Sequence, residues 1–231
     1  MSLLTQSDRA FEAIEAAIVS GEIPLGSKIR EEEFAARIGV SRGPLREALS
    51  RLAGRRLVVR HPRTGSRVVS LTREDLIEIY EMREMLEGLA ARRAAEHMTD
   101  QQVSGVREEL DRHFAEERLK KDDAYLQSSG DRDFHYRIAA GSASVRLQNL
   151  LCGDLYSLIR LCRFRTANSR GRALRAYRDH ERILDAVADR DGELAEILMR
   201  RHVAAARELF FSSEFKIEDW RGDARERAAG E

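Results

Sequence analysis

The fold of the N-terminal third depends on residues 39–49, which read Gly39-Val40-Ser41-Arg42-Gly43-Pro44-Leu45-Arg46-Glu47-Ala48-Leu49. Gly39 fits the left-handed position that closes a helix over 31–38, and Ser41 is placed to cap the helix that follows. Two short helices joined by a tight glycine-containing turn form a helix-turn-helix. Arg42 and Arg46 are four residues apart and therefore share one face of the second helix. We expect this second helix to read DNA.

The flanking residues extend this unit to a winged helix over residues 1–72. Residues 57–61 and 67–70 are short β-type runs, and the Pro-Arg-Thr-Gly-Ser segment between them has turn chemistry. This pattern predicts a β-hairpin wing with Arg63 near its tip. Upstream of the helix-turn-helix, a further helix is indicated by an apolar stripe of Phe11, Ile14 and Ile18.

The formal net charge is zero, with 40 Lys+Arg and 40 Asp+Glu, but the charges are unevenly divided. Residues 1–72 carry 12 Lys+Arg and 8 Asp+Glu, a net charge of +4, and the rest of the chain carries −4. Residues 41–67 hold eight arginines and one acid, Glu47. Such a patch is typical of a surface that binds a polyanion, most often nucleic acid. The alternative is a solvated basic face without a partner, and composition alone leaves both open.

Length and composition exclude several classes of protein. The 231 residues allow one large domain or two modest ones. No apolar run approaches the roughly 20 residues that cross a bilayer, and the first residues lack an apolar signal-peptide core. We therefore expect a cytoplasmic protein with no membrane partner. Cys152 and Cys162 would lie too far apart on one helix to pair, so we expect two reduced core thiols.

The fold class expected for the whole chain is mainly α, with the small wing and a C-terminal all-α antiparallel helical bundle over residues 73–221. Thr72 and the acids after it form a capped helix start. Bundle cores are where metal and ligand sites are built. The charged residues 222–231 are expected to be a flexible tail. Further helices are expected at about 100–121, 122–141, 144–165, 171–190 and 192–213.

The chemically informative residues of this half are Asp131, His135, His180 and His202. At helical spacing Asp131 and His135 share a face, whereas Asp133 faces away from His135. Neutral imidazoles and a carboxylate suit a divalent ion, zinc first and nickel or manganese next. Taken alone, a histidine is more often a core or interface residue, and this is the interpretation for His61, His97 and His113.

Arg83 lies in the middle of an inward apolar stripe on the first helix of the bundle. A buried arginine needs an acidic partner or a bound anion, because an unpaired buried charge costs several kcal/mol. One hypothesis is that Arg83 grips the carboxylate of a small organic acid effector. The alternative, an internal salt bridge to Glu87 or to another helix, is left open at this point.

The N-terminal residues resemble the DNA-binding half of GntR-family bacterial transcription regulators. The matching stretches are residues 24–31, 33–35 and 39–49, with residues 62–68 matching the wing. One departure is Arg56, where members usually carry glycine before the first wing strand. The resemblance, with the wing-tip arginine added, implies DNA contacts from Ser41, Arg42, Gly43, Pro44, Arg46, Arg63 and Gly65.

Residues 73–213 resemble the FCD ligand-binding domain of FadR-type GntR regulators. The similarity lies in Asp-x-x-Phe-His at 131–135, in the segment 179–187 and in Met-Arg-Arg-His at 199–202. In metal-binding members of the group, an Asp and three His from these motifs hold the ion, and a small organic acid or water completes its shell. The resemblance therefore implies the metal-binding branch. A departure occurs at Ser142, where Asn is common.

Together these features predict a metal-dependent, small-carboxylate-responsive transcription regulator. We expect a repressor that binds a palindromic operator as a homodimer and resides at the nucleoid when bound to DNA. The rival hypothesis is a metalloenzyme, such as a hydrolase with an open coordination position, but no nucleophile–base pair accompanies the site. An RNA-binding or architectural protein fits poorly, because the basic patch lacks interleaved aromatic residues.

Overall fold

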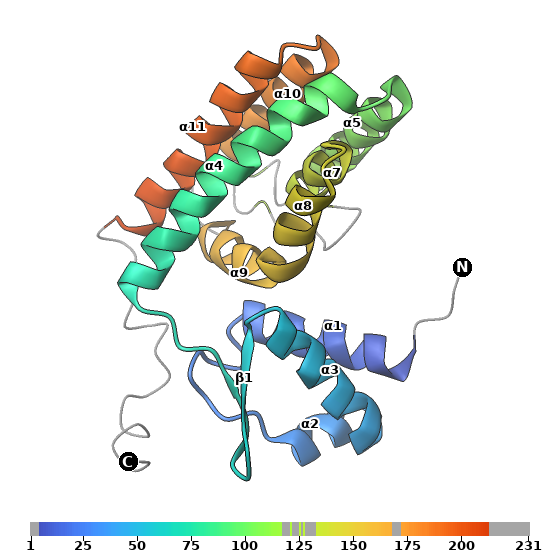
Figure 1. The fold of residues 1–231 in the computed structure, drawn as a ribbon, viewed down its shortest axis with the longest axis vertical. Helices are drawn as coiled ribbons and strands as arrows, with labels where there is room; N and C mark the ends of the chain where they lie inside the picture. Colours follow the sequence, from blue (N-terminus) through green and yellow to red (C-terminus); the bar gives the residue numbers. More distant parts are fainter. Residues whose placement is uncertain are drawn as a thin grey trace. The chain divides into compact units, whose positions relative to one another are not determined.

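The computed structural model of the chain describes residues 5–116, 121, 125, 127, 133–167 and 172–212 (Figure 1). They form two compact units, of which the first ends at Leu76 and the second runs from Ile77 to Ser212. The first unit is a three-helix domain with a two-stranded antiparallel hairpin, and the second is helical in its described residues. The mainly α fold with an N-terminal winged helix-turn-helix is therefore confirmed.

The first unit packs its helices around the apolar face of the second helix of the helix-turn-helix. Leu45, Leu49 and Leu52 of that helix are fully buried. Gly39 ends the preceding helix at φ 68°, as expected for its turn. The elements are α1 (Gln6–Val19), α2 (Glu31–Ile38), α3 (Arg42–Gly54), β1 (Val58–His61) and β2 (Gly65–Val68).

Ser41 occupies the N-cap position of α3 with an extended backbone, but its hydroxyl makes no cap hydrogen bond. The expected position is therefore confirmed, whereas the expected side-chain cap is absent. An exposed serine at this point leaves its hydroxyl and the first backbone N–H groups of α3 turned to solvent, where a phosphate can accept hydrogen bonds from them.

The wing pairs over fewer residues than expected, and its second strand begins earlier. His61 pairs with Gly65 and Val58 with Val68. Strand β2 therefore begins and ends two residues earlier than the expected range 67–70. The reason is the tight turn between the strands, where Arg63 at φ 72° and Gly65 at φ 94° both take left-handed backbone conformations. These two residues reverse the chain quickly enough for pairing to start at Gly65.

Arg56 keeps the backbone conformation that glycine favours. It follows the end of α3 at φ 56°, in the left-handed region. A side chain at this φ is disfavoured because its Cβ crowds the backbone, at a cost of about 1–2 kcal/mol. The replacement of glycine by arginine therefore does not reshape the exit from the helix, and the chain carries the strain.

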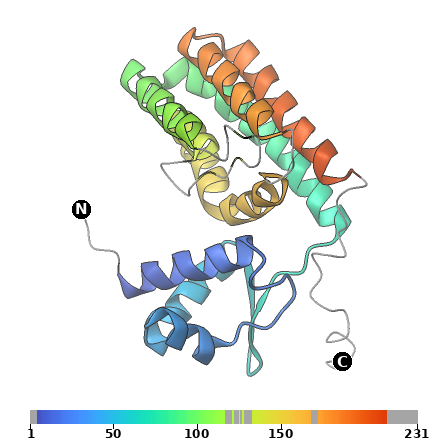
Figure 2. The ribbon, with the colours of Figure 1, turned by 180° about the vertical axis from the view of Figure 1, so that it is seen from behind.

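The second unit begins with a long helix that is capped as expected. Thr72 Oγ1 accepts a hydrogen bond from the backbone N–H of Asp75, and the Asp75 carboxylate accepts one from the N–H of Thr72. Helix α5 packs alongside α10, and α10 alongside α11 (Figure 2). The helices are α4 (Arg73–His97), α5 (Asp100–Ala115), α7 (Phe134–Gly141), α8 (Val145–Gln148), α9 (Tyr156–Ala167), α10 (Ala173–Ala188) and α11 (Gly192–Phe210), with a π-helical segment η2 (Asn149–Asp154).

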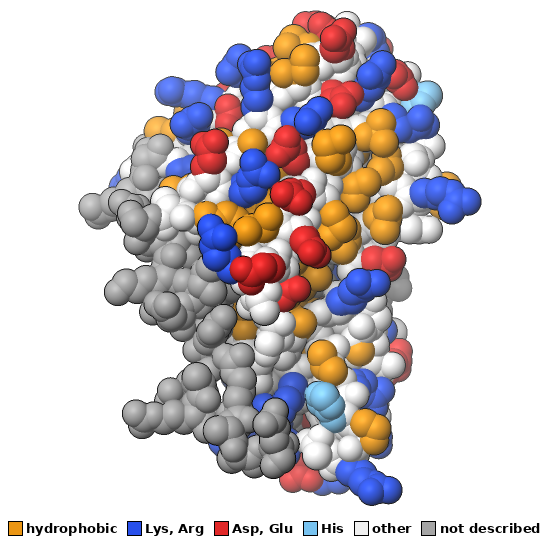
Figure 3. All heavy atoms as spheres, turned by 60° about the vertical axis from the view of Figure 1, so that its left-hand side comes forward, with side chains coloured by type: hydrophobic (Ala, Val, Ile, Leu, Met, Phe, Trp, Pro, Cys, Tyr) orange, Lys and Arg blue, Asp and Glu red, His pale blue; other side chains and the backbone are white. Residues whose placement is uncertain are grey.

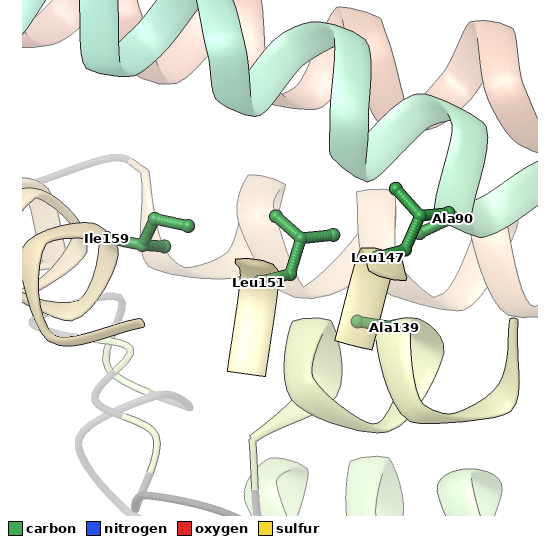
Figure 4. Close-up of a cluster of buried hydrophobic side chains, with 5 residues drawn as sticks. All are labelled: Ala90, Ala139, Leu147, Leu151 and Ile159. Carbon is green, nitrogen blue, oxygen red and sulfur yellow. The ribbon is translucent and has the colours of Figure 1, made fainter. Parts of the chain in front are cut away.

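A cluster of buried apolar side chains joins α4 to the helices from α7 to α9 (Figure 4). Small side chains on α4 and α7 lie against longer ones on α8, η2 and α9, which allows close approach of the helices. The cluster anchors the long helix that carries Arg83. Its members are Ala90, Ala139, Leu147, Leu151 and Ile159.

Three expected helices differ from the observed ones. The helix expected over about 100–121 ends at Ala115, where Glu116 turns extended. Within the range 122–141, helix α7 begins at Phe134, because Asp133 is extended and caps it by accepting a hydrogen bond from the N–H of Tyr136. The helix expected over 144–165 is interrupted by η2, where the N–H of Leu155 donates to the carbonyl of Leu150 five residues earlier. Helical spacing assumes a constant turn, so a π-helical insertion escapes it.

Within the described residues, no helix is long and apolar enough to span a bilayer. Both cysteines are free, as expected: Cys162 is buried and Cys152 half-buried. Burial raises the pKa of the Cys162 thiol to about 11, so the thiol is protonated at neutral pH.

Candidate metal centre and nucleic-acid interface

Three histidines from three helices converge on one point inside the second unit. His135 lies in the first turn of α7, His180 in the middle of α10 and His202 in the middle of α11. The Nε2 atom of His180 is 3.2 Å from Nε2 of His135 and 3.2 Å from Nε2 of His202. All three imidazoles are buried. Their side chains meet because each residue lies on the inward face of its helix, as the neighbouring apolar residues indicated.

Each of these imidazoles is oriented through its other ring nitrogen. Nδ1 of His135 is 2.5 Å from Oε2 of Glu87, and Nδ1 of His202 is 3.4 Å from Oδ2 of Asp179. A carboxylate that accepts from Nδ1–H leaves the lone pair on Nε2, the atom at the centre. The third, His180, has the Tyr125 hydroxyl 3.1 Å from its Nδ1.

The imidazoles are held neutral. Burial lowers the pKa of His202 to about 4, and burial also lowers the pKa of His135. For His180 burial is joined by the two neighbouring histidines, and its pKa lies well below the ordinary value. Neutral imidazole is the form that ligates metals.

The three histidines fit a divalent cation. Ligand nitrogens at 2.0–2.1 Å in a tetrahedral shell lie about 3.3 Å from one another. The Nε2 atoms of His135 and His202 each lie 3.2 Å from Nε2 of His180. All ligand atoms of the cluster lie within 4.8 Å of one another. A buried set of three unprotonated nitrogens at this spacing has the chemistry of a three-histidine metal site with at least one open position.

The fourth expected ligand, Asp131, lies outside the described residues. Asp133, which was expected to face away from His135 on a helix, is instead the extended N-cap of α7, and it is fully buried. It forms an ion pair with Arg163 and accepts a hydrogen bond from the hydroxyl of Tyr156 at 3.1 Å.

Arg83 lies next to this centre and is almost completely buried, with 1% of its surface exposed. Its Nε donates to Oε1 of Glu87 at 2.8 Å, so Glu87 joins Arg83 to His135. Burial opposes the ionisation of Glu87, but the charge of Arg83 and the hydrogen bond with Nδ1 of His135 outweigh burial and hold its pKa below the ordinary value. The internal salt bridge considered above is therefore present.

That salt bridge does not supply a hydrogen-bond acceptor for every nitrogen of the Arg83 guanidinium. Among the described residues, no group accepts a hydrogen bond from Nη1 of Arg83, and the buried hydroxyl of Tyr80 is equally without a partner. The Arg83 guanidinium lies over the Tyr80 ring, 5.0 Å from its centroid. Buried donors are rarely left unpaired, because the loss costs about 1–3 kcal/mol. These two atoms are therefore placed to bind a polar ligand.

Several residues around the site were missed by the sequence reasoning. Asp179 directly precedes His180, and that pairing was a usable signal. Tyr125 lies in a non-helical part of the chain, where no periodicity points to it. His113, interpreted as a core residue, is indeed buried, with its Nδ1 3.2 Å from the Tyr125 hydroxyl. Ser142 is buried too, and its hydroxyl donates to the carbonyl of Ala139 at the end of α7.

In the first unit, a groove runs between the start of α3 and the wing. It is lined by six basic side chains, four from residues 41–67 and two from just before α2, and by the turn of the wing. The DNA-contact residues expected from the sequence lie here: Arg42, Arg46, Arg63 and Gly65 line the groove, and Ser41, Gly43 and Pro44 form the start of α3. Further basic residues line the groove that were not expected to contact DNA: Lys28, Arg30 and Arg60.

Acidic residues also line this groove, which the sequence reasoning did not anticipate. Glu31, Glu32 and Glu33 form the first turn of α2, where carboxylates are stabilised by the helix dipole. Glu32 accepts a hydrogen bond from Nη2 of Arg42 at 2.6 Å, and both side chains are 77% exposed. An expected DNA-reading arginine is thus paired within the protein.

Family models match both units. Residues 6–68 match the model described as "Bacterial regulatory proteins, gntR family", and residues 78–205 match the FCD domain. The "Probable D-xylose utilization operon transcriptional repressor" of Paenarthrobacter nicotinovorans is 32% identical over 206 residues, which cover 87% of each chain. The "Gluconate operon transcriptional repressor" of Bacillus licheniformis is 33% identical over 171 residues, which cover 73% of this chain and 67% of that one.

Solved structures show the same fold. E. coli McbR/YncC matches with a TM-score of 0.70 and 18% identity, covering 90% of this chain and all of that one. A putative GntR regulator from Rhodococcus sp. RHA1 matches with a TM-score of 0.63 and 23% identity, covering 88% and 97%.

Proposed function

The chain belongs to the GntR family of bacterial regulatory proteins and carries an FCD domain, and from this premise we propose that it is a metal-dependent repressor of the FadR type that responds to a small carboxylate. Like its family and its relatives, it is a transcriptional regulator and not an enzyme. We assign DNA binding to residues 1–72 and sensing to residues 73–221. The protein acts in the cytoplasm, at the nucleoid when bound to DNA.

The observation that carries the metal is the convergence of three neutral imidazoles, each oriented by a partner on Nδ1. His135, His180 and His202 supply three ligands for a divalent cation, with zinc favoured and nickel or manganese as substitutes. Asp131 is the fourth protein ligand. The ion, when bound, supplies a Lewis-acidic centre that takes oxygen ligands from an organic acid.

The effector is held beside this centre by Arg83. Its Nη1 and the Tyr80 hydroxyl are buried donors without partners among the described residues, and a carboxylate would satisfy both. Glu87 keeps the guanidinium and His135 in a fixed relation. A relative named as the repressor of a gluconate operon supports a hydroxy-acid class of effector, because gluconate is one.

On DNA, the protein acts as a homodimer on a palindromic operator, because each copy offers one reading helix and two half-sites need two. Arg42 and Arg46 of α3, which line the groove of the protein, supply phosphate and base contacts. The wing with Arg63 reaches the adjoining groove of the DNA. Acid binding at the metal centre changes the affinity for DNA, and operator DNA changes the affinity for the acid by the same factor.

The test combines metal analysis with acid binding. We expect purified protein to contain about one divalent ion per chain and His202→Ala to lose it, whereas His97→Ala, with a histidine outside the cluster, retains it. Titration calorimetry with L-lactate and D-gluconate should show binding to the metal-loaded protein and none after chelation and dialysis. Equal metal content in the two variants, or acid binding that survives chelation, would contradict the proposal.

A further inference from the structure

One histidine of the cluster is oriented differently from the other two. His135 and His202 each face a carboxylate through Nδ1, whereas Nδ1 of His180 lies 3.1 Å from the hydroxyl of Tyr125. A tyrosine hydroxyl can donate or accept a hydrogen bond, so Tyr125 by itself does not determine which nitrogen of His180 carries the proton. The group on the other side of the Tyr125 hydroxyl must determine it.

That group is His113 of α5. Its Nδ1 is 3.2 Å from the Tyr125 hydroxyl, and its Nε2 is 3.4 Å from Oε1 of Glu109, one turn earlier on the same helix. Glu109, His113 and Tyr125 are all buried. The other oxygen of Glu109 forms an ion pair with Arg112, which stabilises the negative charge of the carboxylate. A carboxylate, an imidazole and a phenol therefore lead in series from α5 to His180.

The direction of each hydrogen bond in this series follows from Glu109. An ionised carboxylate only accepts, and burial disfavours an imidazolium, so His113 carries its single proton on Nε2 and a lone pair on Nδ1. The Tyr125 hydroxyl then donates to Nδ1 of His113 and turns its oxygen towards His180. That oxygen accepts from Nδ1–H of His180, which leaves the lone pair of His180 on Nε2, the atom at the centre.

Another neighbour of His180 favours the opposite tautomer. The amide nitrogen of Gln127 lies 3.4 Å from Nδ1 of His180, and the amide oxygen of Gln127 accepts from the N–H of Phe134 at 2.7 Å. An amide N–H beside Nδ1 favours a lone pair on Nδ1, which places the proton on Nε2. Tyr125 is the nearer of the two neighbours, and its oxygen accepts from His180 when His113 takes the hydroxyl proton.

We propose that Glu109, His113 and Tyr125 form a hydrogen-bond chain that holds His180 in its metal-binding tautomer, which makes them positioning residues of the metal centre. This inference rests on the proposed function, because it requires a metal ion at the histidines. None of the three residues is a ligand in this proposal. The metal affinity nevertheless depends on a carboxylate of α5 that is separated from His180 by two other side chains.

Zinc affinity of the full-length protein, measured by competition with a chelator of known affinity, tests the hydrogen-bond chain. Tyr125→Phe removes the acceptor for His180 and should lower the affinity about tenfold to a hundredfold. His113→Phe keeps a ring but offers Tyr125 no acceptor, and it should lower the affinity about tenfold. His113→Asn places an amide oxygen near the position of Nδ1 and should restore most of the difference.

Nitrogen-15 NMR of the zinc-loaded protein separates positioning from packing. The Nδ1–H resonance of His180 is identified as the imidazole N–H signal that Tyr125→Phe alters. It should also shift in Glu109→Gln, which preserves the size of a side chain that does not touch His180. Glu108→Gln removes an exposed acid from the same helix and should change neither the resonance nor the affinity.

The two measurements distinguish failure of this inference from failure of the proposed function. Unchanged zinc affinity in both phenylalanine variants, or a His180 resonance that does not respond to Glu109→Gln, overturns the hydrogen-bond chain and leaves the metal centre in place. Absence of zinc binding by the unaltered protein overturns the proposed metal dependence and the hydrogen-bond chain with it.

Discussion

At the scale of the residue, two arginines keep a strained backbone conformation that the surrounding structure imposes on them. Arg56 stands at φ 56° between α3 and the wing, and Arg63 at φ 72° in the turn of the wing. Of the two, Arg63 lines the groove that we assign to DNA. The strain at these two positions is the sort that persists only when the flanking elements determine the backbone.

Arg56→Gly should stabilise the first unit. Glycine adopts a positive φ without a Cβ clash, and part of the gain is offset because glycine has more freedom in the unfolded chain, so we expect about 1 kcal/mol or less. Urea unfolding at fixed pH measures the free energy of unfolding. Arg56→Ala is the control, since it removes the same charge but keeps the Cβ. A gain in Arg56→Ala as large as in Arg56→Gly would show that charge, not backbone strain, is responsible.

At the scale of the element, an acidic residue in the first turn of α2 pairs with an arginine of α3, the helix that we propose reads DNA. The acidic residues of that turn satisfy the dipole of α2, and Glu32 also pairs with Arg42 of α3 across the groove. Because both side chains are largely exposed, this pair contributes little to stability. Its consequence is for binding, because Arg42 must leave Glu32 before it meets a phosphate.

Glu32→Gln should therefore raise the affinity for DNA of arbitrary sequence by about threefold to fivefold, the size of an exposed ion pair. The dependence of log K on log salt should also steepen, because Arg42 becomes free to displace a counterion. Fluorescence anisotropy with a labelled duplex at several salt concentrations measures both quantities.

Glu47→Gln provides the comparison, because Glu47 is an exposed acid of α3 and its loss changes the net charge equally. If the two variants behave alike, the general field of the protein accounts for the effect and the specific pairing of Arg42 does not.

At the scale of the whole molecule, the second unit presents an apolar surface in addition to its internal site. Met82, Met85 and Leu89 on the outward face of α4 are 41%, 56% and 42% exposed. Figure 3 shows hydrophobic side chains gathered on the surface of this unit next to basic and acidic ones. Charged pairs such as Arg92 with Glu196 tie α4 to α11. An apolar stripe on a long exposed helix is suited to pairing with a second copy.

Met85→Glu should weaken the dimer that we propose by at least about tenfold in its dissociation constant, since a charge would be buried between the copies. Operator affinity should fall in parallel, because a monomer reaches one half-site. Sedimentation equilibrium measures the first effect and anisotropy the second. Glu108→Gln, which removes an exposed acid on α5 and away from this face of α4, should change neither. A Met85→Glu protein that stays dimeric at the same concentration would place the interface elsewhere.

Much of the fold could be predicted from local patterns. Gly39 and the capping residue Thr72 delimit helices through hydrogen bonds to residues within one turn, and the structure contains them. Buried positions such as Leu45 and Arg83 follow from helical spacing for the same reason. What failed was the extent of elements whose ends depend on distant partners. Asp133, held by Arg163 on α9, starts α7 later than periodicity suggests.

The amino-acid sequence by itself determined the winged helix, the helical second unit and the candidate ligands His135, His180 and His202, because residue type and periodicity are local properties. Only the tertiary structure decided that their Nε2 atoms meet and that Glu87 connects His135 to Arg83. These relations join residues 48 or more positions apart, or on separate helices. Helix packing sets such distances, and no spacing along the chain encodes them.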